Sequence, residues 1–277
     1  MAALARSLLR WFGGGARETR VTEATTEGTG PSAGLKAGLD QVVLGNPSYV
    51  WRSGQERRLE MIRRYLPLEG ARVLDIGCGI GAYVRRIRDF TDGAIGLDID
   101  EARVRQGGAA GVPGLAVGLS EALPYADGVL DGVLLNEVIE HVGSDRETLR
   151  EALRVLRPGG KVIIFAPNRF YPFETHGVYL GKRYVFGNIP FVNYLPDPLR
   201  NRLVPHARTY TRSRLERITA GLPACWLDWT VIYPGFDNIV ARKPALGRAL
   251  RTLTYRIETT PLRRLGLSHL LVLEKTA

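Results

Sequence analysis

The stretch VLDIGCGIGAYVRRI, residues 73–87, constrains the fold of this 277-residue chain more than any other. An apolar run is followed by Gly77, Gly79 and Gly81, and then by an amphipathic run with Val84 and Ile87 on one side. Glycine adopts backbone conformations that other residues avoid, so the pattern predicts a tight turn between a strand and a helix. At the first strand of a parallel sheet, such a turn can hold a dinucleotide or another nucleotide, or it can be empty.

Strand and helix patterns alternate on both sides of this turn. Apolar runs typical of fully buried strands alternate with helical patterns such as DRETLREALRVL, which ends in the stop signal RPGG. The predicted strands are ARVLDIG, GAIGLDID, GLAVGLS, LDGVLLNEV, KVIIFAPN, CWLDWTVIYP and SHLLVLEK. Continuous apolar strands between helices indicate an α/β fold, with a parallel sheet covered on both faces.

Cysteine content and hydropathy exclude several classes of protein. Two cysteines, Cys78 and Cys225, make neither a disulfide framework nor a zinc cluster, which favours a reducing, cytoplasmic compartment. No run of about 18 apolar residues is present to span a membrane. The start MAALARSLLRWFGGG lacks a secretory cleavage pattern, and a transit peptide stays open. Residues 1–40 are predicted to be a flexible segment that precedes one domain over residues 41–277.

Positive charge gathers in the C-terminal third. Residues 169–277 contain 17 Lys and Arg against 7 Asp and Glu, whereas residues 71–168 carry a net charge of −3. The segment 244–267 is predicted to be a basic amphipathic helix, with Leu246, Leu250, Leu253 and Ile257 on one face. A basic amphipathic helix is typical of peripheral membrane contact, and a helix packed on the sheet with a solvated basic face is the alternative.

Four motifs follow one another in a recognisable series: VLDIGCGIG, GLDID, SEALPYADGVLDGVLLNEVIEHV and EALRVLRPGGKVIIFAPN. In this series the chain resembles class I S-adenosylmethionine-dependent methyltransferases, in particular the branch of quinone-biosynthesis and related small-molecule methylases. The match is strong over residues 70–168 and weaker over residues 209–277. The resemblance implies a Rossmann-like, seven-stranded sheet of order 3-2-1-4-5-7-6, mostly parallel with the last strand antiparallel, and helices on both faces.

The resemblance also implies S-adenosylmethionine as the cofactor, with S-adenosylhomocysteine as its product, and gives roles to individual residues. The backbone of Gly77, Cys78, Gly79 and Gly81 would lie against the methionine part, and Asp75 would fix the loop or reach the amino group. Asp98, about 20 residues after the glycines, would hold the ribose hydroxyls. Read singly, Asp98 could instead cap a helix, and Cys78 could be a small packing residue.

Two further regions complete the implied cofactor site. Ile99 would contact the adenine face, and Asn136 would lie near the methionine carboxylate or the sulfonium, unless it is only a turn residue. The family often has an acid after the third strand, where this chain has Leu119. Ser120, beside Glu121, or backbone groups are therefore expected to contact the adenine instead.

Methyl transfer to oxygen benefits from a general base, and histidine has a suitable pKa. His141 in NEVIEHV and His176 in PFETHG are the candidate catalytic residues, and a helix-packing role for His141 and a loop role for His176 are the alternatives. The chain lacks the carboxylate cluster of magnesium-dependent methyltransferases, so no metal is expected.

The segment 168–208 is predicted to be an insertion after the fifth strand. Eight aromatic residues lie between positions 168 and 195, which indicates either a lid over an apolar or aromatic acceptor or a self-packed loop. The predicted function is methyl transfer to an oxygen, or as second choice a carbon, of an apolar, aromatic or lipid-linked small molecule. An RNA or protein methyltransferase and a non-catalytic cofactor-binding scaffold stay open, although no nucleic-acid partner is expected. A nicotinamide oxidoreductase is disfavoured, because no Tyr-x-x-x-Lys pattern was found.

Overall fold

A seven-stranded sheet forms the centre of the larger of the two units into which the chain divides. The structure is a computed structural model, and it describes residues 51–181 and 183–276. We call this larger unit, residues 51–169 and 209–276, the sheet unit, and residues 170–181 and 183–208 the insertion unit. The predicted flexible segment 1–40 lies outside the described residues.

The strands of the sheet follow the predicted order. They are β1 (Val73–Ile76), β2 (Ala94–Asp98), β3 (Leu115–Val117), β4 (Leu130–Asn136), β5 (Leu156–Pro167), β10 (Ala224–Ile232) and β11 (Ser268–Lys275). Across the sheet the order is β3-β2-β1-β4-β5-β11-β10. The first five strands pair in parallel, and β11 pairs antiparallel with both β5 and β10. The predicted order 3-2-1-4-5-7-6 is confirmed.

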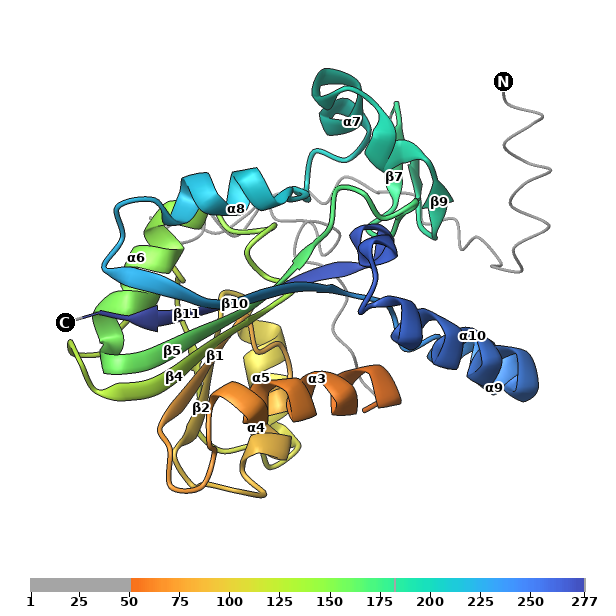
Figure 1. Cartoon of the computed structure of the whole chain (residues 1–277). Helices are drawn as coiled ribbons and strands as arrows, with labels where there is room; N and C mark the ends of the chain where they lie inside the picture. The colour runs from red at the N-terminus through yellow and green to blue at the C-terminus, as the bar shows by residue number, and fades with distance from the viewer. Residues whose placement is uncertain (1–50, 182, 277) are drawn as a thin grey trace, which may run out of the picture. The chain divides into compact units, whose positions relative to one another are not determined.

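Helices cover both faces of this sheet, as Figure 1 shows. On one face lie α3 (Ser53–Tyr65), α4 (Ala82–Ile87) and α5 (Glu101–Ala109), and on the other lie α6 (Asp145–Val155) and α8 (Arg212–Thr219). Each face has its own buried cluster: Leu59 and Ile87 belong to the first, and Leu149 and Leu215 belong to the second. Strands buried on both faces explain the continuous apolar runs of the sequence.

Between β10 and β11 the chain forms α9 (Asp237–Arg242), α10 (Pro244–Ile257) and the 3-10 helix η2 (Pro261–Leu265). The single helix predicted over residues 244–267 is therefore interrupted after Ile257. Thr260 caps η2 through its side chain, which accepts from the backbone N–H of Leu262 at 3.2 Å and so favours a new helical start. Among the described residues, no helix is long and apolar enough to cross a membrane.

The insertion unit has its own small set of elements. They are β6 (Phe173–Glu174), β7 (Val178–Leu180), β8 (Arg183–Val185), β9 (Ile189–Pro190), the 3-10 helix η1 (Val192–Tyr194) and α7 (Asp197–Leu203). β6 pairs with β9 and β7 with β8, both antiparallel. A separate cluster of buried apolar residues holds these elements together, namely Val178, Val192, Val204 and Ala207. The segment thus packs on itself, as one of the two readings of its sequence predicts.

Candidate functional site

The glycine turn joins β1 to α4 in a conformation that requires glycine. Gly77, Gly79 and Gly81 all have positive φ angles, of 69°, 55° and 79°. The backbone N–H groups of Gly77 and Cys78 both donate to the Leu97 carbonyl, at 2.7 and 3.2 Å, which ties the turn to the end of β2. A Cβ atom on Gly77 would lie only 2.4 Å from Cγ2 of Val138. The turn is therefore fixed from two neighbouring strands.

Asp98 ends β2 next to this turn and is 5% exposed. Its Oδ2 accepts the N–H of Gly79 at 2.7 Å, and its Oδ1 accepts the N–H of Asp100 at 2.8 Å. The alternative reading of Asp98 as a helix cap is wrong, because Asp100 caps α5 and accepts from Ala102 N at 2.9 Å. An ionised carboxylate offers about four acceptor positions, so Asp98 can bind further hydroxyl donors.

Two other predicted residues surround the turn in the core. Asp75 is 4% exposed in the middle of β1, and burial, together with the nearby charge of Asp98, raises its pKa to about 8. Cys78 is also buried, and a Cβ on Gly96 would lie 2.7 Å from its sulfur. Burial, followed by the charges of Asp75 and Asp98, raises the pKa of the Cys78 thiol. Cys78 therefore packs as a small residue and is no activated nucleophile.

Of the residues predicted to lie near adenine, some are exposed or half-buried, and others form hydrogen bonds within the protein. Ile99 is half-buried directly after β2, and Leu119 is 43% exposed after β3. Ser120 is buried, and its hydroxyl donates to Glu121 at 2.8 Å and lies 3.1 Å from the Thr148 hydroxyl. Glu121 also accepts the backbone N–H of Ser144, the cap of α6, at 3.1 Å. Ser120 and Glu121 thus anchor the loop to α6, and their contact with adenine stays a prediction.

Asn136 ends β4 and accepts a hydrogen bond from Arg58 of α3. The same guanidinium donates to Glu137 at 2.6 Å and to the Ser268 hydroxyl at 2.9 Å, and it lies 4.7 Å from the ring centre of Phe165. Burial lowers the pKa of Arg58, but the charges of Glu137, Tyr83 and Glu140 and the hydrogen bond to Glu137 together outweigh this effect, so the pKa is raised overall. A half-buried cation therefore lies at the carboxyl end of β4, beside Asn136.

Sequence reasoning missed Arg58, although a signal was present. Arg58 and Ile62 are four residues apart, so they lie on the same face of α3, and Ile62 is 1% exposed. A basic residue on the apolar face of a helix that packs against a sheet needs a buried polar partner. That partner could not be named, because Asn136 is 78 residues away in the chain.

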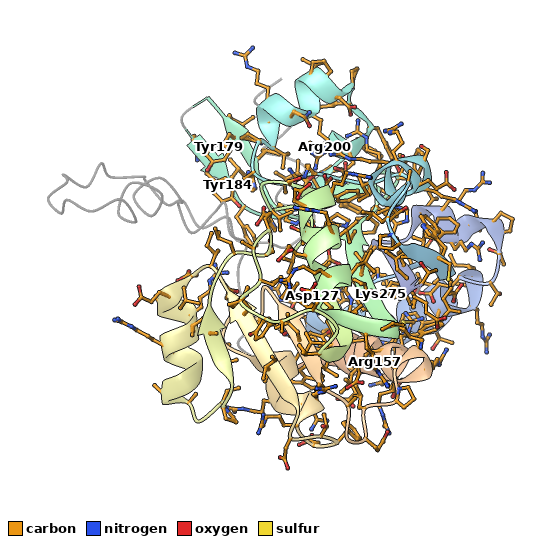
Figure 2. All side chains as sticks on the ribbon, turned by 90° about the vertical axis from the view of Figure 1, so that its left-hand side faces the viewer. Asp127, Arg157, Tyr179, Tyr184, Arg200 and Lys275 are labelled. Atoms are coloured by element: carbon orange, nitrogen blue, oxygen red, sulfur yellow. The ribbon has the colours of Figure 1, made fainter. Side chains whose placement is uncertain are left out.

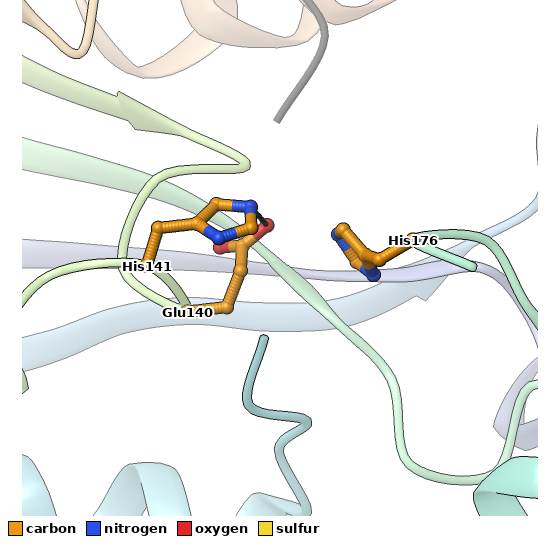
Figure 3. A group of neighbouring side chains, drawn as sticks. All are labelled: Glu140, His141 and His176. Carbon is orange, nitrogen blue, oxygen red and sulfur yellow. Dashed lines mark ion pairs between the residues drawn. The ribbon is translucent and has the colours of Figure 1, made fainter. Parts of the chain in front are cut away.

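His141 lies in an irregular turn between β4 and α6, which begins at Asp145. Its backbone N–H donates to the Val138 carbonyl at 2.9 Å, and the hydroxyl of Tyr210 donates to the Ile139 carbonyl at 2.8 Å. His141 is therefore not part of a helix, and its catalytic role stays a prediction. His141 Nε2 lies 3.8 Å from Oε1 of buried Glu140 (Figure 3). This separation is an ion-pair distance and too long for a hydrogen bond.

His176 follows β6 in the insertion unit and is also drawn in Figure 3. Its Nδ1 lies 2.9 Å from Oε1 of Glu174, and its backbone N–H donates to the same oxygen at 2.9 Å. The other oxygen of Glu174 pairs with Arg200 at 2.8 Å, and both side chains are 1% exposed. Burial raises the pKa of Glu174, but the hydrogen bonds and charge of His176 and the charge of Arg200 lower it to about 2.

Aromatic side chains of the insertion unit fall into an inner and an outer set. Tyr179 and Tyr184 lie opposite each other on the β7–β8 hairpin, with ring centres 5.2 Å apart (Figure 2). Both rings also contact the ring of His206 edge-on. The outer set is exposed by 46 to 64% and comprises Phe170, Phe186, Phe191 and Tyr194. Four of the eight Phe and Tyr side chains of the unit are therefore exposed at its surface.

Sequence comparison finds methyltransferases that are similar to the part of the chain that contains the glycine turn. A family model described as a methyltransferase domain matches residues 74–164. A probable S-adenosylmethionine-dependent methyltransferase of Mycolicibacterium smegmatis is 38% identical over 117 residues, or 41% of this chain and 45% of that protein. A ubiquinone biosynthesis O-methyltransferase of Parvibaculum lavamentivorans is 32% identical over 133 residues, which are 46% of this chain and 52% of that protein. The chain spans about half the length of these curated relatives.

Solved structures extend the agreement over most of the chain. The structure of an S-adenosylmethionine dependent methyltransferase from Mesorhizobium loti covers 78% of this chain and 96% of its own, with a TM-score of 0.55 and 17% identity. At that identity the likeness concerns the fold alone. The matched domain, residues 74–164, contains the glycine turn, Asp98, Asn136 and His141. The strand order, the glycine turn and these matches show a methyltransferase domain over residues 74–164, and they support a class I S-adenosylmethionine-dependent methyltransferase.

Proposed function

We propose that this protein transfers a methyl group from S-adenosylmethionine to an oxygen of an apolar, aromatic or lipid-linked small molecule, with a carbon acceptor as the second choice. The observation that carries the proposal is the glycine turn against Asp98. Three left-handed glycines place backbone N–H groups beside a buried carboxylate that still has acceptor positions. The methyltransferase domain matched over residues 74–164 implies S-adenosylmethionine as the group that this turn would hold.

The residues of the sheet unit fit the polar groups of that cofactor. Asp98 would accept the ribose hydroxyls, held in place by the N–H groups of Gly79 and Asp100. Arg58 and Asn136, which are bonded to each other, would supply a cation and an amide for the methionine carboxylate. Asp75 would fix the loop or reach the amino group, and Ile99 would contact the adenine ring.

The cofactor supplies an electrophilic methyl group on a sulfonium sulfur. The chain would align the acceptor oxygen with that methyl, so that an O–C bond forms as the S–C bond breaks and S-adenosylhomocysteine leaves. The hydroxyl proton of the acceptor passes to a general base. We propose His141 or His176 for this role, since each imidazole lies within ion-pair distance of a carboxylate: Glu140 for His141 and Glu174 for His176.

Two observations support an apolar acceptor. One relative is named a ubiquinone biosynthesis O-methyltransferase, and the insertion unit exposes four aromatic side chains. The basic C-terminal third favours an RNA or protein methyltransferase as a second candidate. We prefer the small molecule, because the exposed arginines of α10 alternate with exposed leucines, which an RNA backbone would not contact. We also propose that the protein works in the cytoplasm, at the membrane surface.

Calorimetry with S-adenosylmethionine and S-adenosylhomocysteine tests the proposal first. We expect both to bind, and we expect Asp98→Ala to weaken binding by about tenfold or more, because it removes hydrogen bonds to a charged acceptor. Asp127→Ala is the matched control, since this carboxylate is exposed and pairs with Arg154. Absence of binding would refute the function, and an unchanged affinity in Asp98→Ala would move the ribose contact elsewhere.

The acceptor is identified in a second experiment. Small molecules that remain bound to the purified protein are extracted and identified by mass spectrometry, and phenols and quinols with short and long apolar tails are assayed for methyl transfer. We expect the rate to increase with the length of the tail. Methylation of RNA or protein with no methylation of these small molecules would favour the second candidate. Cofactor binding without any transfer would favour a scaffold.

A further inference from the structure

Helix α10 exposes two of its three leucines to solvent, and the third, Leu250, is half-buried. Leu246 is 51% exposed and Leu253 is 59% exposed, and Gly247 is the single buried residue among its 14. The two leucines are seven residues apart and therefore lie on the same side of the helix. An amphipathic helix on the surface of a soluble protein normally turns this side toward the core. In α10 the apolar side faces outward.

Polar contacts on the inner side hold α10 in this orientation. Arg251 donates to the Gly235 carbonyl at 2.8 Å and pairs with Asp237 at 3.2 Å. The Arg57 guanidinium lies 3.6 Å from the ring centre of Tyr255, and a Cβ on Gly247 would lie 2.5 Å from the backbone nitrogen of Val240. Rotating the helix to bury Leu246 and Leu253 would break all of these contacts, so the exposure is built into the packing.

Basic side chains flank the exposed stripe. With Leu246 at 0° on a helical wheel, Lys243 lies at about 60° and Arg256 at about 280°, one on each side of the leucines. Lys243 and Arg256 are both exposed. The acids nearest in sequence are Asp237 and Glu258, and both form ion pairs, with Arg251 and Arg57 respectively. The adjacent η2 adds exposed leucines at 262 and 265 and an exposed Arg264.

We propose that α10 docks the protein onto an anionic phospholipid bilayer, with Leu246 and Leu253 inserted at the headgroup boundary and Lys243 and Arg256 beside the phosphates. An apolar stripe between basic flanks is the pattern by which a helix lies in the plane of a membrane surface. Two copies of the chain would instead bring two basic faces together, which disfavours a symmetric dimer through this helix. A nucleic acid would engage the basic residues and leave the leucines in water.

The docking helix and the glycine turn belong to the same edge of the sheet. The chain returns from α10 and η2 into β11 at Ser268, which pairs with Pro167 at the carboxyl end of β5. In Figure 1, α9 and α10 extend from the sheet on this side. Docking would bring an acceptor dissolved in the bilayer to the edge of the sheet that holds the cofactor, and this role of α10 rests on the proposed function.

Liposome flotation with the full chain tests the docking without turnover. Vesicles of phosphatidylcholine alone are compared with vesicles in which a third of the lipid is phosphatidylglycerol, at low and high salt. We expect binding to the anionic vesicles that weakens with salt. The double variant Leu246→Gln, Leu253→Gln should weaken binding by about tenfold or more. Leu227→Gln, which changes a 47% exposed leucine of β10, is the matched control and should bind as the wild type does.

Flotation and calorimetry together distinguish a failure of the docking proposal from a failure of the proposed function. Leu246 and Leu253 are both exposed, so the double variant should fold, and calorimetry with S-adenosylmethionine checks this. Retained cofactor binding with lost flotation in the double variant supports the docking helix. Flotation without cofactor binding leaves the docking intact and refutes the function. Equal flotation of wild type and double variant, binding to neutral vesicles alone, or a dimer in solution that the double variant dissociates would overturn the proposal.

Discussion

At the scale of single residues, Gly77 meets two separate constraints. Its φ angle of 69° is costly for any residue with a Cβ, and that Cβ would also lie 2.4 Å from Val138. Gly111 has a φ of 78° and nothing within 4 Å of its Cβ position, so it meets the first constraint alone. Comparison of the two glycines separates backbone strain from the close approach of the turn after β4.

We expect Gly77→Ala to lower the free energy of unfolding by about 2 to 5 kcal/mol, because strain and overpacking add. Gly111→Ala should cost only about 1 to 2 kcal/mol, the strain alone. Urea unfolding of both variants measures the difference, and calorimetry should find cofactor affinity reduced in Gly77→Ala only. Equal losses of stability would mean that the Val138 side chain moves aside without cost.

Asp75 makes the stability of the sheet unit depend on pH. Burial, followed by the charge of Asp98, raises its pKa to about 8, whereas an aspartate in the unfolded chain titrates near 3.8. Between these two values the folded chain holds a proton that the unfolded chain has lost, so the contribution of Asp75 to stability falls as pH rises from about 4 to about 8. Above that range the contribution is constant.

The variant Asp75→Asn should remove this dependence. We expect it to be more stable than the wild type at pH 8 by about 2 to 4 kcal/mol, and nearly equal at pH 4, since an amide has no charge to bury. Urea unfolding at several pH values measures the two curves. Parallel curves would show that Asp75 is ionised in the folded protein throughout this range.

At the scale of elements, the insertion unit depends on one buried ion pair. Glu174 at the end of β6 and Arg200 in α7 are both 1% exposed, and Arg200 also donates to the Ala207 carbonyl at 2.8 Å. Arg200→Met leaves the Glu174 carboxylate without this cation, at a cost of about 3 to 5 kcal/mol. Hydrogen exchange should therefore accelerate over residues 170–208 and stay unchanged in the sheet.

A control and a rescue accompany this experiment. Arg202→Met changes an exposed arginine of the same helix and should leave exchange as in the wild type. The double variant Glu174→Gln, Arg200→Met removes both charges and should recover part of the protection, because a buried pair replaced as a whole costs little. Unchanged exchange in Arg200→Met would mean that the apolar cluster around Val192 holds the unit by itself.

The elements that sequence could predict are those fixed by local pattern. The apolar run 73–76, the three glycines and the amphipathic run after them specify β1, the turn and α4 within 15 residues. The role of Arg58 depends on Asn136 and Ser268, which are 78 and 210 residues away in the chain. A short stretch of sequence cannot predict contacts between residues so far apart. The helical wheel of α10 identifies its leucine face, but Arg57 and Asp237 decide which way that face turns. Sequence identified His141 as a candidate catalytic residue, but the turn that holds it depends on a contact from Tyr210, 71 residues away from Ile139, which no local pattern contains.

At the scale of the whole molecule, two carboxylates at the carboxyl edge of the sheet unit, Asp98 and Glu137, accept hydrogen bonds from the protein's own donors. Asp98 accepts two backbone N–H groups, and Glu137 accepts from Arg58 and Ser268. A divalent cation would have to displace these donors to gain such carboxylates as ligands. A sulfonium is, in addition, already an activated methyl donor, so alignment and a base are sufficient for the reaction.

Methyl transfer should therefore proceed without an added metal. We expect the initial rate to be the same, within about twofold, in the presence of EDTA and after addition of Mg²⁺, because neither alignment nor proton removal needs a Lewis acid. Cofactor binding measured in the same buffers controls for general effects of the chelator on the fold. Loss of the rate in EDTA with recovery in Mg²⁺, at constant cofactor affinity, would contradict the expectation. It would direct attention to Glu140 and His141, whose side chains already lie 3.8 Å apart beside the end of β4.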